Sequence, residues 1–541
     1  MSLDRDLPSE PVTKRRPRAR PKGRQVDPAA EAEIRALLGA APRRRDLLIE
    51  HLHAIQDRFG QLSAAHIRAL AEEMRLAEAE VFEVASFYHH FDIVKEGAAD
   101  LPPLTLRVCA SLSCMLAGAD ALAERLAGLI DPARVRLVRA PCMGRCDKAP
   151  AVLLGRNAIA PAGAENIAAA IAAGAVEPEV PTFTGLEGYR AGGGYLVLDS
   201  CRAGARTPEA VIAKLTHAGL RGLGGAGFPA GRKWQIVRDQ PAPRFVTVNA
   251  DEGEPGTFKD RHYLETDPHR VLEGALIAAW AVAASRIYIY LRDEYPHIRA
   301  VLAGEIARLD ETGLTAGCPI ELRRGAGAYV CGEESAMLES IEGKRGLPRN
   351  RPPYIAETGL FGRPTLNHNV ETLYWVRDII DRGPDWFAAL GTDGHKGLRS
   401  YSVSGRVRNP GVHQAPAGIS LAALIDGYCG GMAEGHSLAA FLPGGASGGI
   451  FPAAMAGLPL DFGTFEPHGG FVGSHAVIVL SDRDDLAAVA RNLIAFFADE
   501  SCGQCTPCRV GTEKLQALIA GDSWDEALIA ELAAVMRDAS I

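Results

Sequence analysis

The sequence predicts a multidomain α/β protein, and three observations lead to that prediction. The chain has 541 residues, which is too long for one hydrophobic core and suggests roughly three to four domains. Its hydrophobic fraction of 47% and its 58 glycines are typical of a globular protein with many tight turns. Strand-like and helix-like segments alternate through the middle of the chain, whereas both ends have helical periodicity.

The composition also argues against several classes of protein. No run of about 18 apolar residues occurs, and no apolar segment follows the basic residues at the start. We therefore expect no membrane span and no export signal, and we predict a cytoplasmic location. The net charge of -8 gives no reason to expect nucleic acid as a partner.

Residues 1–28 contain a basic, proline-rich segment, Lys14–Arg24. Two interpretations are open, an arm that docks on anionic partners and a solvated disordered tail. We predict the disordered tail, because such a segment cannot bury a core.

Residues 29–98 are predicted to form a helical bundle, since apolar residues recur there at intervals of three and four. The periodic segments are Glu31–Leu38, Arg45–Ile55 and Ser63–Ala71. The pattern changes after Pro102 and Pro103. Residues 99–178 then predict a small α/β domain, with the strands Leu104–Cys109 and Val135–Arg139 on either side of a helix near Ala119–Ile130.

A linker rich in Pro, Thr and Gly at Pro178–Gly194 precedes a larger unit, residues 179–395. Its alternation of strands and helices predicts a wound α/β sheet. The strands are Arg244–Asn249 and Arg286–Leu291, and the helices include Pro268–Ala284 and His297–Leu309. Residues 396–481 predict a small β-rich domain with glycine-rich turns, and residues 482–541 are helical again.

Seven of the 11 cysteines fall into two tight groups, as multi-cysteine metal centres require. Cys502, Cys505 and Cys508 are separated by two residues each, a spacing that suits a 4Fe-4S cluster. Zinc is the alternative, but it usually takes cysteine pairs that are further apart. A cube wants four ligands, and no cysteine follows Cys508 in the sequence.

The earlier group consists of four cysteines just after the two strands of the small α/β domain, Cys109, Cys114, Cys142 and Cys146. Thiolates from two adjacent loops suit a 2Fe-2S cluster, with zinc again as the alternative. The remaining four cysteines are scattered, as small buried apolar residues usually are.

A dense glycine run, Gly219–Trp234, is a candidate cofactor loop. Its glycines would let backbone N–H groups approach a phosphate or a flat ring, and Lys233 would add positive charge. The run does not follow a clear strand, so the dinucleotide fingerprint of a Rossmann fold is not satisfied. A plain turn is the alternative interpretation.

Two acidic patches support a cofactor site. Asn249–Gly256 comes directly after a strand, where α/β proteins hold ligands, and Gly327–Glu334 opens a predicted helix. Taken alone, each is equally compatible with a solvated acidic turn or helix start. Together with the glycine run they favour a nucleotide site.

These segments resemble the FMN- and NADH-binding subunit of respiratory complex I and the diaphorase subunits related to it. The resemblance rests on Gly222–Trp234, Asn249–Arg261, Tyr329–Arg345, Arg363–Leu373 and Ser501–Arg509. Residues 29–178 resemble the 2Fe-2S, thioredoxin-like subunit of complex I, here fused in front. The resemblance implies a Rossmann-like FMN/NADH domain at 179–395, a ubiquitin-like β-grasp domain at 396–481 and a helical 4Fe-4S domain at 482–541.

Within that family the chain resembles most the fused beta subunit of soluble formate dehydrogenases that depend on molybdenum or tungsten. The segments that carry this resemblance are Pro21–Asp27, Arg45–Leu52, Tyr290–Tyr295 and Leu442–Gly449. The resemblance implies a partner, an alpha subunit with a molybdenum or tungsten pterin and further iron–sulfur clusters. A nickel–iron hydrogenase or a respiratory complex is the alternative partner, and a non-catalytic electron-relay subunit is the alternative of another class.

The resemblance also implies roles for individual residues. FMN would lie on the glycine run, and the implied FMN contacts are Gly222, Gly224, Gly225, Gly227, Lys233, Asn249, Asp251, Glu252, His368 and Asn369. The implied NAD(H) contacts are Glu254, Tyr329, Gly332, Glu333 and Glu334, with Phe228 and Tyr354 beside the adenine. Hydride would pass between nicotinamide and FMN, and electrons between FMN and the 4Fe-4S cluster, so the three glutamates position NAD(H) rather than donate protons.

The chain departs from the family's pattern at four places. His368 replaces the first of two asparagines, Ile236 stands at a commonly aromatic position, and Tyr354 stands where phenylalanine is usual. These changes concern nucleotide affinity rather than the chemistry. In the family a cysteine follows a segment like Met536–Ile541, and we predict cysteine as the next residue of the natural chain.

Overall fold

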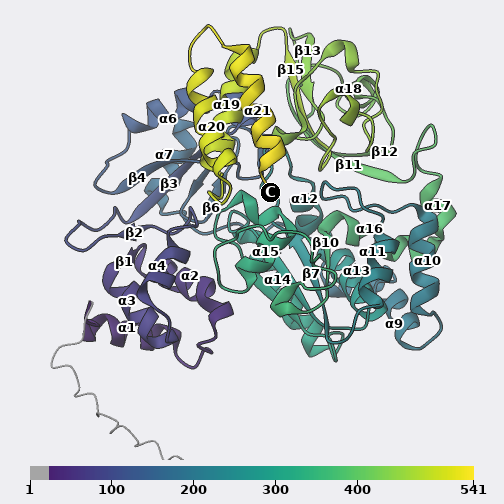
Figure 1. Ribbon diagram of the computed structural model, residues 1–541, viewed down its shortest axis with the longest axis horizontal. Coiled ribbons are helices and arrows are strands. Elements are labelled where there is room, and N and C mark those ends of the chain that lie inside the picture. The colour runs from purple at the N-terminus through teal and green to yellow at the C-terminus, as the bar shows by residue number, and fades with distance from the viewer. Residues whose placement is uncertain (1–23) are drawn as a thin grey trace, which may run out of the picture.

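The structure is a computed structural model that describes residues 24–541 (Figure 1). Most of the predicted basic tail, residues 1–23, therefore lies outside the described residues. Four sheets and the helices around them follow one another along the chain. Their arrangement agrees with the prediction of a multidomain α/β protein.

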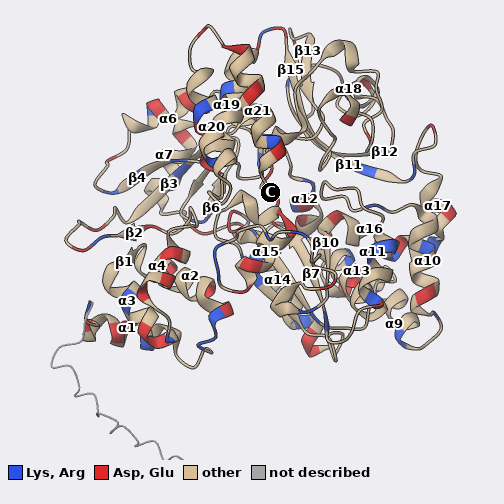
Figure 2. Ribbon diagram, in the orientation of Figure 1, with Lys and Arg blue, Asp and Glu red and all other residues tan. Residues whose placement is uncertain are grey.

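The N-terminal part is helical, as predicted. Its elements are α1 (Pro28–Leu38), η1 (Arg45–Leu47), α2 (Leu48–Phe59), β1 (Leu62–Ser63), α3 (Ala64–Met74), α4 (Glu78–Ala85) and β2 (Ile93–Val94). The Asp27 carboxylate caps α1 and the Ser63 hydroxyl caps α3. Sequence periodicity missed α4, which is only 8 residues long. Acidic and basic residues are interspersed over these helices (Figure 2), so no face of one sign stands out there.

The next sheet has the strand order β4-β3-β5-β6. Its strands are β3 (Leu104–Cys109), β4 (Val135–Ala140), β5 (Val152–Leu154) and β6 (Asn157–Ile159), and its helices are α5 (Leu112–Leu116), α6 (Ala119–Ala127), η2 (Cys146–Lys148) and α7 (Ala164–Ala173). The two predicted strands pair in parallel, from Leu104 opposite Val135 to Cys109 opposite Ala140. Both cysteine loops therefore leave the same edge of the sheet. The short hairpin of β5 and β6 was not predicted.

The segment predicted as a linker is partly helical. Residues 178–194 contain α8 (Leu186–Ala191), which is followed by α9 (Leu196–Arg202), α10 (Pro208–Ala218) and α11 (Ala230–Arg238). The start of α8 is anchored where Leu186 N donates to the Glu305 carboxylate at 3.0 Å. Glycines at its boundaries concealed this short helix in the sequence.

The central sheet is parallel, with the order β10-β7-β8-β9. Its strands are β7 (Arg244–Ala250), β8 (Ala284–Leu291), β9 (Ile320–Arg324) and β10 (Thr365–Asn369). The helices around it are α12 (Lys259–Thr266), α13 (Pro268–Ala281), α14 (Pro296–Glu311), η3 (Tyr329–Gly332), α15 (Glu334–Ile341), η4 (Leu360–Gly362), α16 (Val370–Arg382) and α17 (Pro384–Ala388).

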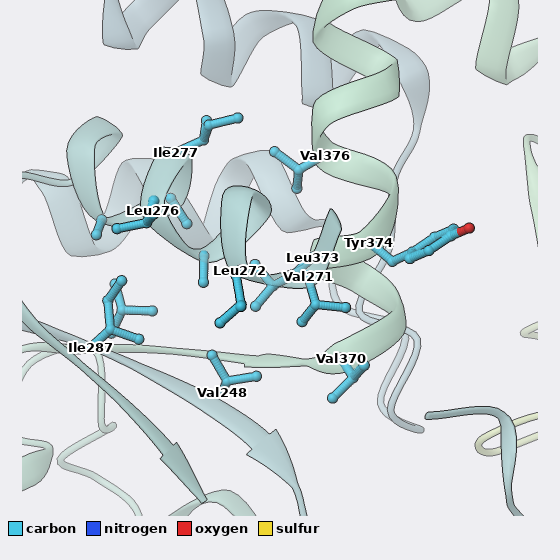
Figure 3. Packing of buried hydrophobic residues seen from close by; sticks show 14 of the residues in the cluster. Val248, Val271, Leu272, Leu276, Ile277, Ile287, Val370, Leu373, Tyr374 and Val376 are labelled. Atoms are coloured by element: carbon cyan, nitrogen blue, oxygen red, sulfur yellow. The ribbon is translucent and has the colours of Figure 1, made fainter. Parts of the chain in front are cut away.

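The largest core cluster joins this sheet to α13 and α16 (Figure 3). Val248 and Ile287 of the sheet face Leu272 and Leu276 of α13, and all four side chains are buried. Burying such a side chain stabilises the fold by about 1.5–3 kcal/mol relative to leaving it exposed. The core thus holds β7 and β10 rigidly, and the loops at their carboxyl ends start from fixed positions.

The fourth sheet is mixed and has the order β12-β11-β15-β13-β14. Its elements are β11 (Leu398–Gly405), β12 (Gly411–Pro416), α18 (Leu421–Gly427), β13 (Leu438–Leu442), η5 (Ala446–Gly448), β14 (Phe451–Pro452), η6 (Ala453–Met455), η7 (Glu466–His468) and β15 (Ala476–Ser481). The chain ends in α19 (Leu486–Asp499), α20 (Thr506–Leu518) and α21 (Glu526–Ala539).

The last three helices lie between the β3 and β11 sheets, and the C-terminal residue comes to the middle of the molecule (Figure 1). Leu493 and Phe496 of α19 pack against Leu112 of α5 and against Ile478 and Leu480 of β15. The tail that carries the last three cysteines is thereby held over the central sheet. Among residues 24–541, no helix is long and apolar enough to cross a bilayer.

Candidate functional site

One cavity of about 820 Å³ opens at the carboxyl edge of the central sheet. It brings together most of the residues predicted from sequence, although they come from segments far apart in the chain. The predicted residues that line it are Gly222, Gly224, Gly225, Phe228, Lys233, Asn249, Asp251, Glu252, Glu254, Tyr329, Gly332, Glu333, Glu334, His368, Asn369, Cys502, Cys505 and Cys508. Gly227 and Tyr354 do not line it.

The glycine run forms a tight loop between α10 and α11. Gly222 N donates to Phe228 O at 2.8 Å, and Gly227 N donates to Gly222 O at 3.2 Å. Gly225 lies at the cavity with a φ of +138°, and a Cβ built there would meet no atom within 4 Å. The loop therefore offers bare backbone to the cavity, as a flat ring or a phosphate requires. Gly227 instead faces the Phe462 ring.

Lys233 reaches the cavity from α11 and binds Glu334, with 3.0 Å between Nζ and Oε2. Burial would raise the pKa of Glu334, but the ammonium of Lys233 and the guanidinium of Arg351 together lower it. This glutamate is therefore charged near neutral pH. It also makes Lys233 a neutralised cation rather than a free one before any ligand binds.

The acidic loop after β7 is organised by its own side chains. Asn249 donates from Nδ2 to Gly332 O at 2.8 Å and accepts from Asp251 N at 3.1 Å. Both carboxylate oxygens of Glu252 accept backbone N–H groups at the start of α12, those of Asp260 at 2.7 Å and of Arg261 at 3.0 Å. The Glu252 carboxylate thus caps a helix, while the loop it holds forms the cavity wall.

Asp251 has an unpartnered buried oxygen, Oδ2. Burial raises the pKa of Asp251 to about 8, although the Arg292 charge opposes the shift. A buried carboxyl without a partner is costly, and the cavity is where a ligand would supply the missing hydrogen bond. This orphaned oxygen and the bare glycine loop both fit a polar-edged flat ring.

We expect Asp251→Asn to change how the stability of the flavin-free protein depends on pH. An unfolded aspartate has a pKa of about 3.9, so between about pH 4 and pH 8 only the folded state holds the proton. Folded stability from this group is therefore present below pH 4 and is lost as pH rises to 8, by at most about 1.4 kcal/mol per pH unit. The Asn variant lacks this loss.

Melting temperatures at about pH 5 and pH 8 check this result, with Asp381→Asn as control because Asp381 is exposed on α16. The Asp251→Asn variant should gain stability relative to wild type at the higher pH, and the control should not. An equal difference at both pH values would contradict the assignment.

Glu254 joins three segments at the cavity. Its Oε2 accepts from the Tyr329 hydroxyl, and its Oε1 accepts from Ser447 N at 2.7 Å and Ser447 Oγ at 2.8 Å. Burial raises the pKa of Glu254, and these hydrogen bonds oppose the rise. The carboxylate fixes the acidic loop, η3 and η5 to one another.

The end of β10 supplies His368 and Asn369. Trp234 Nε1 donates to His368 Nε2 at 2.7 Å, and burial, assisted by Lys233, lowers the pKa of His368 well below its ordinary value. The imidazole is therefore neutral with its proton on Nδ1. Asn369 accepts from Lys259 Nζ at 3.2 Å and donates to Asp260 at 2.6 Å. Both side chains have partners inside the protein.

Glu333 and the two predicted aromatic rings have distinct positions. Glu333 Oε2 caps α15 through Ser335 N at 3.0 Å and Ala336 N at 2.9 Å, and its other oxygen binds Arg351. Phe228 is 40% exposed at the cavity, whereas Tyr354 is 56% exposed outside the lining. The structure therefore does not bring the two rings to one wall of the cavity.

Several lining residues were not anticipated. The fourth sheet contributes Ser447, Phe471 and Ser474, and the start of the cysteine tail contributes Glu500. Glu500 accepts from Tyr329 N at 2.9 Å. The glycine-rich turn at Leu442–Gly449 was visible in the sequence, but nothing local indicated which loop it would meet.

Cys502, Cys505 and Cys508 line the same cavity on the side of α20. Ile541 N lies 3.4 Å from Cys505 Sγ, so the end of the described chain is beside these thiols. The prediction that cysteine follows Ile541 remains a prediction.

The other four cysteines are buried together at the edge of the β3 sheet. Cys142 Sγ and Cys146 Sγ are 3.4 Å apart, and the Cys109 thiol contacts those of Cys114 and Cys142. The Phe258 ring packs on Cys142 and Cys146, while the preceding residue, Thr257, lines the large cavity. The acidic loop is thus a thin partition between the cavity and this thiol group.

Comparisons with known proteins agree with this division of the chain. Residues 215–378 match the Nuo51 FMN-binding domain, residues 34–175 the thioredoxin-like [2Fe-2S] ferredoxin, residues 400–451 the SLBB domain, and residues 488–541 the NADH-ubiquinone oxidoreductase-F iron-sulfur binding region. The second of two NADH-quinone oxidoreductase F chains in Rhizobium meliloti is 42% identical over 344 residues, which cover 62% of this chain and 82% of that protein. The chain belongs to the family of NADH-quinone oxidoreductase F chains.

Other relatives extend the similarity. The F chain of the NADH-quinone oxidoreductase of Aquifex aeolicus is 40% identical over 61% of this chain and 78% of its own length. A chain of an NAD⁺-reducing [NiFe]-hydrogenase in its H2-reduced state has a TM-score of 0.81 and 33% identity, and the match covers 92% of this chain and 88% of that one. This second match includes the fused N-terminal part.

Membership of this family makes the chain an NAD(H)-dependent oxidoreductase subunit of the FMN diaphorase type, which passes electrons to iron–sulfur clusters. The expected cofactors, FMN, NAD(H), a 2Fe-2S and a 4Fe-4S cluster, are confirmed at the level of domains. So are the predicted thioredoxin-like and FMN-binding domains.

Proposed function

We propose that this chain exchanges electrons between NAD(H) and its iron–sulfur clusters through FMN held in the large cavity. One observation carries the proposal. The glycine loop, the acidic loop and three cysteines of the tail line a single cavity of about 820 Å³. A flavin there would have the nucleotide site and a cluster site as immediate neighbours.

The bare loop around Gly225 and the ammonium of Lys233 suit the flavin phosphate and ring, and Asp251 Oδ2 suits a polar ring edge. Asn249, Glu252, His368 and Asn369 act by shaping this pocket, because their polar atoms already have partners. Flavin, when bound, accepts two electrons as hydride and releases them singly.

NAD(H) is proposed to lie against Glu254, Tyr329, Gly332, Glu333 and Glu334. The Tyr329–Glu254–Ser447 contacts hold that wall in place, and the carboxylates orient the nucleotide without taking part in proton transfer. Phe228 is the exposed ring placed to contact the adenine. For Tyr354 this role requires a movement toward the cavity.

The metal sites are proposed as follows. Cys109, Cys114, Cys142 and Cys146 hold the 2Fe-2S cluster, and their mutual contact supports this set. Cys502, Cys505 and Cys508 hold the 4Fe-4S cluster together with a cysteine after Ile541.

The test of the diaphorase proposal uses the purified, flavin-loaded chain. We expect a flavin absorption band and NADH oxidation with artificial electron acceptors. A flavin-loaded protein without that activity would rule out the enzyme and leave the non-catalytic relay.

For the partner we propose the alpha subunit of a molybdenum- or tungsten-dependent formate dehydrogenase, whose electrons would reach NAD⁺ through this chain. The sequence resemblance of Tyr290–Tyr295 and Leu442–Gly449 supports it. The similarity to a chain of an NAD⁺-reducing [NiFe]-hydrogenase supports a second candidate, a hydrogenase partner.

Co-purification from the source organism separates the two. Mass spectrometry should identify a pterin-containing subunit of a formate dehydrogenase, and formate should reduce NAD⁺ in the purified complex. Reduction by hydrogen with a nickel–iron subunit present would overturn the formate assignment.

A further inference from the structure

We propose that Arg292 is a positioning residue that raises the reduction potential of the 2Fe-2S cluster and ties that cluster to the flavin loop. Arg292 follows directly after β8 and is only 4% exposed. The inference rests on the proposed ligand role of Cys142.

The guanidinium connects the two loops through their backbones. Arg292 Nη2 donates to Cys142 O at 2.5 Å, and Nη1 donates to Glu252 O. Cys142 is one of the four clustered thiols, and Glu252 belongs to the acidic loop that walls the large cavity. One fixed fork therefore sets the distance between the cluster loop and the flavin loop.

The same group places a permanent positive charge beside the thiols. Its charge is balanced by Glu294, which accepts from Nη2 at 2.8 Å and from Nε at 3.1 Å. The Cys142 carbonyl is bonded directly to the guanidinium, whereas Glu294 is bonded on the Nε and Nη2 side. The donated hydrogen bonds, rather than a net charge, therefore dominate at the cluster loop.

Reduction of a 2Fe-2S cluster adds one electron to a site already made negative by thiolates. Hydrogen bonds and positive charge nearby favour the reduced form, and such surrounding groups are a recognised determinant of cluster potential. Arg292 supplies both from a buried position, where solvent screens them least.

A second network supports the fixed position of the loop. Arg261 binds Asp147 at 2.8 Å and Glu265 at 2.9 Å, and Arg145 binds Glu265 at 3.1 Å. These contacts hold residues 145–147 on the central domain without touching Cys142. Removing Arg292 alone should therefore change the electrostatics of the cluster loop before it detaches the loop.

The test is an EPR-monitored redox titration of the full chain with its cofactors, comparing wild type with R292Q, R292K and R292Q/E294Q. At the wild-type midpoint potential, we expect R292Q to lower the reduced-to-oxidised ratio of the 2Fe-2S cluster about tenfold. That corresponds to about 59 mV for one electron. R292K, which keeps the charge but cannot span both carbonyls, should shift the potential less.

The double variant removes both charges, so its midpoint should lie between those of wild type and R292Q. The 4Fe-4S midpoint serves as an internal reference. R323Q is the matched control, because Arg323 is also buried, binds Glu321 at 2.6 Å and donates to Asp46 O at 2.8 Å, but lies on β9.

An unchanged 2Fe-2S midpoint in R292Q, an equal shift in R323Q, or a double variant at or above the wild-type midpoint would each overturn the inference. If R292Q does not assemble the cluster, R292K decides. Loss of the cluster from R292K would also overturn it, since Arg292 would then be needed for assembly alone. Absence of a 2Fe-2S signal from wild type would instead refute the proposed ligand set, and the inference with it.

Discussion

Gly225→Val is expected to empty the flavin site. The glycine has a φ of +138°, which L side chains rarely adopt, and it lines the large cavity where a Cβ would meet no protein atom. A valine would therefore both strain the loop and occupy the space that the flavin needs. Strain and overlap of this kind cost about 1–3 kcal/mol each. We expect flavin affinity to fall about 10- to 100-fold or more.

Flavin content per chain and a fluorescence titration with FMN measure this effect. The matched control is Gly204→Val, because Gly204 also has a positive φ of +77° and open space around it but does not line the cavity. Both variants carry backbone strain, and only Gly225→Val should lose flavin. Equal losses would show that strain alone is responsible, and normal content in both would refute the proposed position of the flavin.

Elements with strong local signals were predictable from sequence. The predicted strand Arg244–Asn249 is β7, and the predicted helix at Pro268–Ala284 is α13, because apolar spacing over many residues reports burial directly. Short elements such as α4, α8 and the hairpin of β5 and β6 were missed. They have too few residues for a period, and they are stabilised by contacts with distant segments, such as the bond from Leu186 N to Glu305.

The candidate site shows the same boundary between local and long-range information. The acidic loop was found because it follows a strand of an α/β sheet, where ligands bind. Ser447 and Phe471 were missed because only the docking of the fourth sheet brings them to the cavity. The internal partners of Glu252 and Asn369 could not be foreseen either, since helix α12 supplies them.

Cys508→Ser is expected to abolish the 4Fe-4S cluster while the rest of the protein stays loaded. Cys508 lies in the first turn of α20 and lines the cavity with Cys502 and Cys505. A serine hydroxyl is a harder and less acidic ligand than a thiolate, so it replaces the sulfur poorly in an iron–sulfur site. The four thiols of the other cluster are buried at the β3 sheet and do not depend on this residue.

EPR of the NADH- or dithionite-reduced protein, with iron and flavin contents, measures the result. The 4Fe-4S signal should fall below about a tenth of wild type, while the 2Fe-2S signal and flavin remain. Cys318→Ser is the control, because Cys318 is a partly buried thiol outside both groups. NAD⁺ reduction by the partner complex should fall by about 100-fold or more, since electrons would lose the cluster next to the flavin. A variant that keeps its 4Fe-4S signal and full iron content would exclude Cys508 as a ligand and move the cluster away from this cavity.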